Sequence, residues 1–235
     1  MQTSLLDEPA AASDMAAALD ADGHAVLPGL LAPAQCDALA ALYPHDALFR
    51  STVVMARHGF GRGEYRYFAY PLPPLLARLR QALYPQLVPL ANRWNQLLGS
   101  PLRYPDTLDA FLERCHRAGQ TRPTPLILSY GAGDYNCLHQ DLYGEHVFPL
   151  QVAILLSRPG VDFTGGEFVM TESRPGVQRA HVVPLAQGDG VVFAVHQRPG
   201  QGPTGRVRRL EMRHGVSRLL GGRRHTVGLI FHDAA

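Results

Sequence analysis

The sequence predicts an α+β fold, in which a mainly helical N-terminal portion supports a C-terminal jelly roll or sandwich of short strands. Two observations lead to this prediction. Apolar residues recur at helical spacing in the first half of the chain, and short apolar runs separated by Gly and Pro follow residue 120. With 235 residues, 46% of them hydrophobic, the chain can bury one large core, so we expect a single domain over residues 1–235.

The N-terminal portion should contain a loose tail, residues 1–13, and then mainly helical support, residues 14–120. The expected helices cover residues 14–19, 33–44, 75–98 and 108–118, and an expected strand covers residues 23–29. Pro85 and Pro89 should interrupt the third helix, because proline lacks the backbone donor and its ring clashes with the preceding turn.

The C-terminal portion, residues 121–235, should form the jelly-roll core. The expected strands cover residues 125–130, 150–156, 167–170, 182–185, 190–195, 212–219 and 225–231. Gly165 and Gly166 should form a turn between strands, because glycine adopts positive φ without a steric penalty.

Composition excludes several classes of protein. The net charge of +2 is too small to imply a polyanion partner by itself. Three widely spaced cysteines favour neither a disulfide framework nor a zinc cluster, and they fit a reducing cytoplasm. The sequence has no apolar run near the roughly 18 residues of a membrane span and no signal-like start, so we expect no membrane partner.

A candidate metal site begins at His139 and Asp141, which follow a strand-like run. Residues i and i+2 of an extended segment project to the same face, so both side chains can bind one metal ion. A third ligand from a distant strand would complete the two-histidine, one-carboxylate set that non-haem Fe(II) oxygenases use. We expect His214 to be that ligand, with His196 as the competing candidate.

An arginine at a fixed distance favours His214 over His196. Arg224 lies ten residues after His214 in an expected strand, and Thr226 shares its face, so the two could hold a carboxylate of an organic acid. Ten residues after His196 comes Arg206, in a Gly- and Arg-rich stretch typical of a loop.

These residues resemble those of the 2-oxoglutarate/Fe(II)-dependent dioxygenases of the prolyl-hydroxylase-like group. The chain resembles more closely a bacterial family proposed to act oxidatively on damaged nucleic acid. The most specific blocks are residues 130–145, 162–168, 188–193 and 213–233. The resemblance implies a double-stranded β-helix (jelly-roll) fold and an enzyme that uses Fe(II), 2-oxoglutarate and dioxygen, releases succinate and hydroxylates a substrate.

The resemblance also implies roles for particular residues. His139, Asp141 and His214 would be the iron ligands, and Arg224 would bind the far carboxylate of 2-oxoglutarate. Tyr130 matches a position that often contacts this co-substrate, and Thr226 completes an Arg-x-Ser/Thr pattern.

The substrate class stays open at this point. The Arg-rich segment 198–213 and the interleaved basic and aromatic residues of segment 57–68 favour single-stranded or damaged nucleic acid, with oxidative demethylation of bases as the reaction. A hydroxylase of protein, peptide or amino-acid side chains is one alternative, and an oxygenase of another small metabolite is a second. A non-catalytic sensor of 2-oxoglutarate and metal is a third hypothesis. We expect segment 198–213 to be an insert that shapes substrate access.

Overall fold

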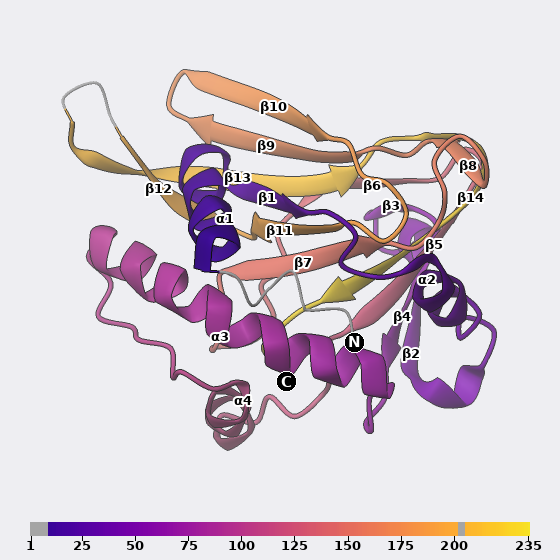
Figure 1. Cartoon of the computed structure of the whole chain (residues 1–235), viewed down its shortest axis with the longest axis horizontal. Coiled ribbons are helices and arrows are strands. Elements are labelled where there is room, and N and C mark those ends of the chain that lie inside the picture. The colour runs from indigo at the N-terminus through magenta and orange to yellow at the C-terminus, as the bar shows by residue number, and fades with distance from the viewer. Residues whose placement is uncertain (1–8, 202–204) are drawn as a thin grey trace.

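Two antiparallel β-sheets face each other, and the helices lie outside them (Figure 1). The computed structural model describes residues 9–201 and 205–235. The larger sheet has the order β1-β11-β7-β14-β5-β4-β2, with β8 paired to β14, and the smaller has the order β10-β9-β13-β6-β3, with β12 paired to β13. The α-helices are α1 (Pro9–Asp22), α2 (Pro33–Ala40), α3 (Pro74–Leu97) and α4 (Leu108–Arg117). The strands are β1 (His24–Leu27), β2 (Phe49–Val54), β3 (Gly61–Arg62), β4 (Glu64–Phe68), β5 (Leu126–Gly131), β6 (Tyr135–His139), β7 (Leu150–Leu155), β8 (Phe163–Gly165), β9 (Phe168–Arg174), β10 (Val177–Val183), β11 (Gly190–Ala194), β12 (Gln197–Gln201), β13 (Val207–Val216) and β14 (Leu219–Leu229).

The start of the chain and the strands of the N-terminal half differ from the prediction. Helix α1 already begins at Pro9, so the expected loose tail is wrong for residues 9–13, and residues 1–8 lie outside the described part of the chain. Strands β2 and β4 were not expected, yet they extend the larger sheet beyond β5. The sequence of β2 lacks the apolar alternation that predicts a strand, and in the structure every residue of β2 is at least partly exposed.

Helix α3 runs without a break through Pro85 and Pro89, so the expected interruption is wrong. Both prolines are exposed, and they share one face of the helix because they are four residues apart. Carbonyl groups that lose a helical donor on this face can bond to water. On the opposite face, Leu83, Leu87 and Trp94 are buried in the main core, and this packing holds the helix together.

Most of the strands expected after residue 120 are present, with bounds shifted by a few residues. The Gly165-Gly166 turn has positive φ at both residues, 69° and 67°, as predicted. The described residues of segment 198–213, the expected insert, include the strands of the hairpin β12–β13, and Arg206 lies in the loop between them, as predicted. Arg198 is buried there, where it donates to the carbonyls of Asp20 and Ala21 and pairs with Glu172. This arginine fastens α1 to the smaller sheet.

A buried ion pair ties the end of the larger sheet to the helices. Asp233 follows β14 and is fully buried, and Arg80 of α3 donates to its Oδ1 over 3.4 Å and to the carbonyl of Phe231 over 3.1 Å. The other carboxylate oxygen accepts from Tyr70 Oη at 2.9 Å and lies 2.8 Å from His116 Nε2. The C-terminal end of β14, the strand that contains Arg224, is thereby anchored on α3 and α4.

We predict that Arg80→Leu lowers the free energy of unfolding by about 3–5 kcal/mol, because it leaves the Asp233 carboxylate buried without its guanidinium partner. Urea denaturation followed by circular dichroism measures the change. Arg78→Leu is the matched control, since Arg78 is exposed on the same helix and its replacement should cost less than about 0.5 kcal/mol. Equal stability of the two variants would show that the pair does not anchor the fold.

Candidate active site

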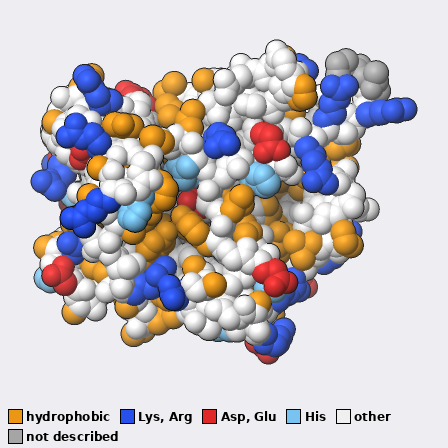
Figure 2. All heavy atoms as spheres, turned by 180° about the vertical axis from the view of Figure 1, so that it is seen from behind, with side chains coloured by type: hydrophobic (Ala, Val, Ile, Leu, Met, Phe, Trp, Pro, Cys, Tyr) orange, Lys and Arg blue, Asp and Glu red, His pale blue; other side chains and the backbone are white. Residues whose placement is uncertain are grey.

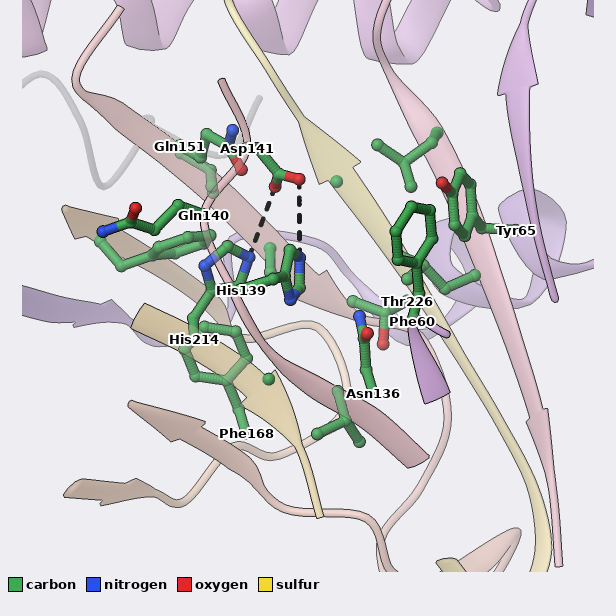
Figure 3. A pocket seen from close by; sticks show the side chains of 18 of the residues that line it. Phe60, Tyr65, Asn136, His139, Gln140, Asp141, Gln151, Phe168, His214 and Thr226 are labelled. Atoms are coloured by element: carbon green, nitrogen blue, oxygen red, sulfur yellow. Dashed lines mark ion pairs between the residues drawn. The ribbon is translucent and has the colours of Figure 1, made fainter. Parts of the chain in front are cut away.

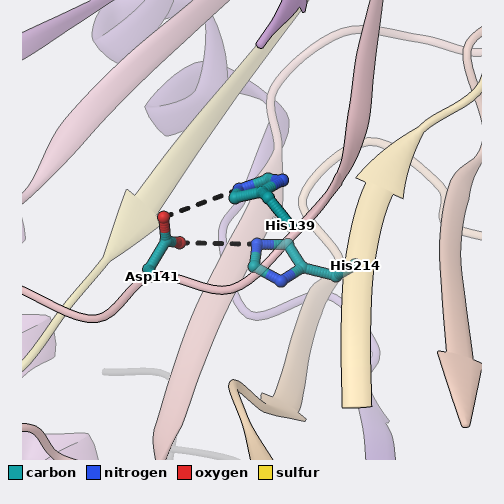
Figure 4. Close-up of side chains that lie close together, drawn as sticks. All are labelled: His139, Asp141 and His214. Atoms are coloured by element: carbon teal, nitrogen blue, oxygen red, sulfur yellow. Dashed lines mark ion pairs between the residues drawn. The ribbon is translucent and has the colours of Figure 1, made fainter. Parts of the chain in front are cut away.

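His139, Asp141 and His214 come together between the two sheets (Figure 4). His139 is the last residue of β6, Asp141 follows it by two residues, and His214 pairs directly with His139 from β13. Asp141 Oδ1 lies 3.5 Å from His139 Nε2, and Oδ2 lies 3.4 Å from His214 Nε2. The three potential ligand atoms lie within 4.8 Å of one another. This is the arrangement that the sequence predicted for a metal site.

The surroundings hold these three groups in the forms that bind a cation. His139 Nδ1 is 2.8 Å from the carbonyl oxygen of Cys137, which favours a proton on Nδ1 and a free lone pair on Nε2. Burial alone would raise the pKa of Asp141, but the hydrogen bond and charge of His214, with the charge of His139, hold that pKa well below its usual value. Burial lowers the pKa of His214, and the charge of His139 lowers it further.

Tyr143 holds the carboxylate from the other side. Its hydroxyl donates to Asp141 Oδ1 over 2.7 Å, and burial and the Asp141 charge raise the pKa of Tyr143, so it stays protonated as a donor. Tyr143 was not among the residues that the sequence predicted for the site. The signal was the i+2 spacing from Asp141, which could place both side chains on one face.

His196, the competing candidate, lies elsewhere. Its Nε2 is 3.5 Å from Glu211 Oε2, and its side chain is partly exposed. Among the described residues, the one cluster of three or more metal-binding groups is His139, Asp141 and His214. The structure therefore brings the preferred histidine to the aspartate and leaves His196 outside.

Arg224, Tyr130 and Thr226 form what we call the arginine end of the pocket. Arg224 is 2% exposed, donates to Thr226 Oγ1 over 2.6 Å and has no described carboxylate within ion-pair distance. Burial lowers the pKa of Arg224 to about 10, so the guanidinium stays charged at neutral pH. Arg224 Nε and Tyr130 Oη are buried without hydrogen-bond partners among the described groups. A buried cation and unpaired donors suit a carboxylate ligand.

A cavity of about 220 Å³ connects this end to the His139-Asp141-His214 cluster (Figure 3). Its other walls are largely apolar and aromatic, and include Phe60, Tyr65, Tyr67, Leu126, Phe168 and Phe193. From outside, hydrophobic side chains line a hollow on this face of the molecule, and arginine side chains lie on the surface around it (Figure 2). An apolar cavity with a few convergent polar groups is typical of a small-molecule or cofactor site.

Residues 63–234 match the model of the Oxygenase-NA family, described as an oxygenase catalysing oxidative methylation of damaged DNA. Two uncharacterized proteins of Mycobacterium tuberculosis, from strains CDC 1551 and H37Rv, are each 52% identical over 169 residues, which is 72% of this chain and 72% of theirs. No helix among the described residues is long and apolar enough to cross a membrane.

Three solved structures with the same fold are distant in sequence from this chain. A prolyl-4-hydroxylase from Pseudomonas putida has a TM-score of 0.56 and 17% identity, over 95% of this chain and 99% of its own. A 2OG-Fe(II) oxygenase family oxidoreductase from Burkholderia pseudomallei has a TM-score of 0.55 and 18% identity, over 95% and 93%. The α-ketoglutarate dependent epimerase SnoN of nogalamycin biosynthesis has a TM-score of 0.58 and 20% identity, over 95% and 83%. These likenesses confirm the predicted jelly-roll fold.

We predict that Tyr143→Phe weakens metal binding by about 10-fold or more, because loss of the hydroxyl frees the Asp141 carboxylate to rotate. Anaerobic titration calorimetry with Fe(II) measures the affinity. Tyr65→Phe is the matched control, since Tyr65 lines the same cavity and makes no hydrogen bond to Asp141. Unchanged affinity in the Tyr143 variant would mean that the hydroxyl does not position the carboxylate.

Proposed function

This chain belongs to the Oxygenase-NA family and is an oxygenase of the 2-oxoglutarate/Fe(II) class, and we propose that it uses His139, Asp141 and His214 as its iron ligands. The observation that carries this proposal is the convergence of two imidazoles and one carboxylate on one point between the sheets. That set leaves coordination positions open for a co-substrate, as in non-haem Fe(II) oxygenases. In this assignment the enzyme couples decarboxylation of 2-oxoglutarate to succinate with oxidation of a second substrate by dioxygen.

The groups at the arginine end fit 2-oxoglutarate. The co-substrate is a dicarboxylate, and the Arg224 guanidinium would hold its far carboxylate while the other end reaches the metal. Tyr130 of β5 is paired with Arg224 of β14, and Thr226 is two residues from Arg224 on the same strand face, so the Tyr130 and Thr226 hydroxyls can donate to the same carboxylate. Each of the two buried unpaired donors, Arg224 Nε and Tyr130 Oη, would then gain a partner.

The protein's own part in the reaction is to position groups and exclude water. Bound Fe(II) would supply the centre at which dioxygen is activated and 2-oxoglutarate is oxidised. Cys137 and Tyr143 hold His139 and Asp141 through hydrogen bonds, so the ligands do not have to reorganise when the metal binds. The walls formed by Phe168 and Phe193 pack against the His214 ring and keep that side of the site dry.

Nucleic acid is the substrate class that we propose. The loop that leads to β3 presents Phe60, 47% exposed, at the cavity, with the ring of His58 stacked on it at 5.4 Å and 22°. Arg57 and Arg62 are exposed on either side of this pair. Exposed rings can stack on bases while nearby guanidinium groups neutralise phosphates. The family description, which names damaged DNA, supports the same class.

We predict that anaerobic addition of Fe(II) and 2-oxoglutarate gives a visible metal-to-ligand charge-transfer band, because both would bind in one coordination sphere. The band and succinate formation should be lost in His139→Ala, Asp141→Ala and His214→Ala. His196→Ala is the control and should keep both, since His196 lies outside the cluster. A well-folded wild-type protein without the band would contradict the iron/2-oxoglutarate assignment.

For the substrate class, we predict binding to a short single-stranded DNA that weakens as salt rises, because binding to phosphates releases counterions. Fluorescence anisotropy gives the slope of log affinity against log salt concentration. Replacing Arg57 and Arg62 by Ala should reduce that slope by about 0.7 for each phosphate that the variant no longer neutralises. Arg78→Ala on helix α3 serves as the control. Binding that is absent or insensitive to salt would favour a peptide substrate instead.

A further inference from the structure

The cavity continues past the metal-binding cluster to an end that the 2-oxoglutarate assignment does not use. Strand pairing defines this end: Tyr67 of β4 lies beside Leu126 of β5, Leu126 beside Gly228 of β14, and Gly228 beside Ala153 of β7. Gly228 is four residues from Arg224 on the same strand face, so the two ends are about 13 Å apart along the sheet. Gln151 precedes Ala153 by two residues and lies on the same face of β7. We call the region around these residues the glutamine end.

Figure 3 shows how the two ends lie relative to the metal-binding cluster. Gln151 lies beside Asp141 on one side, whereas Thr226 and Asn136 lie on the other. The small side chains of Ala153 and Gly228 leave space at the base of the glutamine end, and the ring of Tyr67 borders it. A group bound there would therefore sit next to the metal without displacing 2-oxoglutarate.

Gln151 is the one side chain at this end whose polar atoms have no partner in the described part of the protein. It is 4% exposed, it lines the cavity, and its Nε2 is buried without a hydrogen-bond partner among the described residues. A buried carboxamide that is left unpaired is costly, so a ligand is the natural partner for it. The phenol of Tyr143 is already committed to Asp141, and the guanidinium of Arg50 stacks on Tyr67 at 4.4 Å.

We propose that Gln151 recognises the hydrogen-bonding edge of the substrate ring, and that this ring is a nucleobase placed at the glutamine end of the cavity. This inference rests on the proposed function. A carboxamide presents a donor and an acceptor side by side, and this pair matches the adjacent donor and acceptor on a base edge. If a base were turned out of its strand into the cavity, its edge would contact Gln151 and its ring would contact Tyr67.

No charged side chain among the residues described lines the glutamine end, since Arg50 stacks on the ring of Tyr67 but is not part of the cavity lining. Gln151, Ala153, Gly228 and Leu126 are neutral, and Asp141, the one acidic residue in the described lining of the cavity, belongs to the metal-binding cluster. A neutral, planar ring with polar edges fits this lining better than an ionised side chain, which would be buried there without a counter-charge.

The test compares wild type with Gln151→Met, which keeps the length of the side chain and removes both hydrogen-bonding groups. Each protein is assayed with single-stranded oligonucleotides that carry one methylated base of a defined type. The measurements are succinate release dependent on the oligonucleotide, anaerobic affinity for the same oligonucleotide, and the charge-transfer band with Fe(II) and 2-oxoglutarate. Gln178→Met, an exposed replacement on β10, is the matched control.

If the inference holds, Gln151→Met keeps the charge-transfer band, loses about 10- to 100-fold in kcat/KM on the preferred base, and discriminates less between base types than wild type. Gln178→Met should behave as wild type. If Gln151→Met discriminates between methylated bases as strongly as wild type does, the role of Gln151 is overturned and the proposed function still stands. A wild type with the band but no response to any methylated oligonucleotide would overturn the nucleic-acid substrate and this inference together.

Discussion

The register between β6 and β13 is the constraint on which the site depends. His139 and His214 are directly opposite in that pairing, with ring centroids 4.2 Å apart. A slip of one residue would turn His214 to the outer face of the sheet and leave Asp141 with one imidazole. Glycine at position 215 permits this pairing, because a Cβ there would lie 2.7 Å from the backbone oxygen of Asn136. The close approach of the two backbones thus brings the two imidazoles of the proposed metal site together.

The larger sheet supplies the rest of the site by the same means. Its inward-facing residues form successive rows across β4, β5, β14 and β7, and the type of side chain differs from one row to the next. One row pairs Arg224 with Tyr130, and a row four residues further along β14 pairs Gly228 with Leu126 and Ala153. Arg224 and the small residue Gly228 are thereby separated along β14. The smaller sheet places the imidazoles of His139 and His214 between these two rows.

The sequence alone predicted the parts of this arrangement that follow from short periodicities. The spacing of His139 and Asp141, and that of His214, Arg224 and Thr226, located the groups that the structure brings together. It could not show that exposed Pro85 and Pro89 leave α3 intact, because that depends on which face of the helix meets water. Tyr143 and Gln151 could not be predicted for a similar reason. The hydrogen bond from Tyr143 to Asp141, and the lack of a partner for Gln151 Nε2 among the described residues, are visible only in the folded structure.

The position of β14 in the larger sheet has a consequence for how the protein is made. It lies between β5 and β7, both of which precede it in the chain by more than 60 residues. During synthesis, β5 and β7 must therefore wait with unpaired edges until β14 leaves the ribosome, so the central gap in the sheet closes late. Because β14 also carries Arg224 and Thr226, a nascent chain can bring His139, Asp141 and His214 together before the residues proposed to hold 2-oxoglutarate are in place.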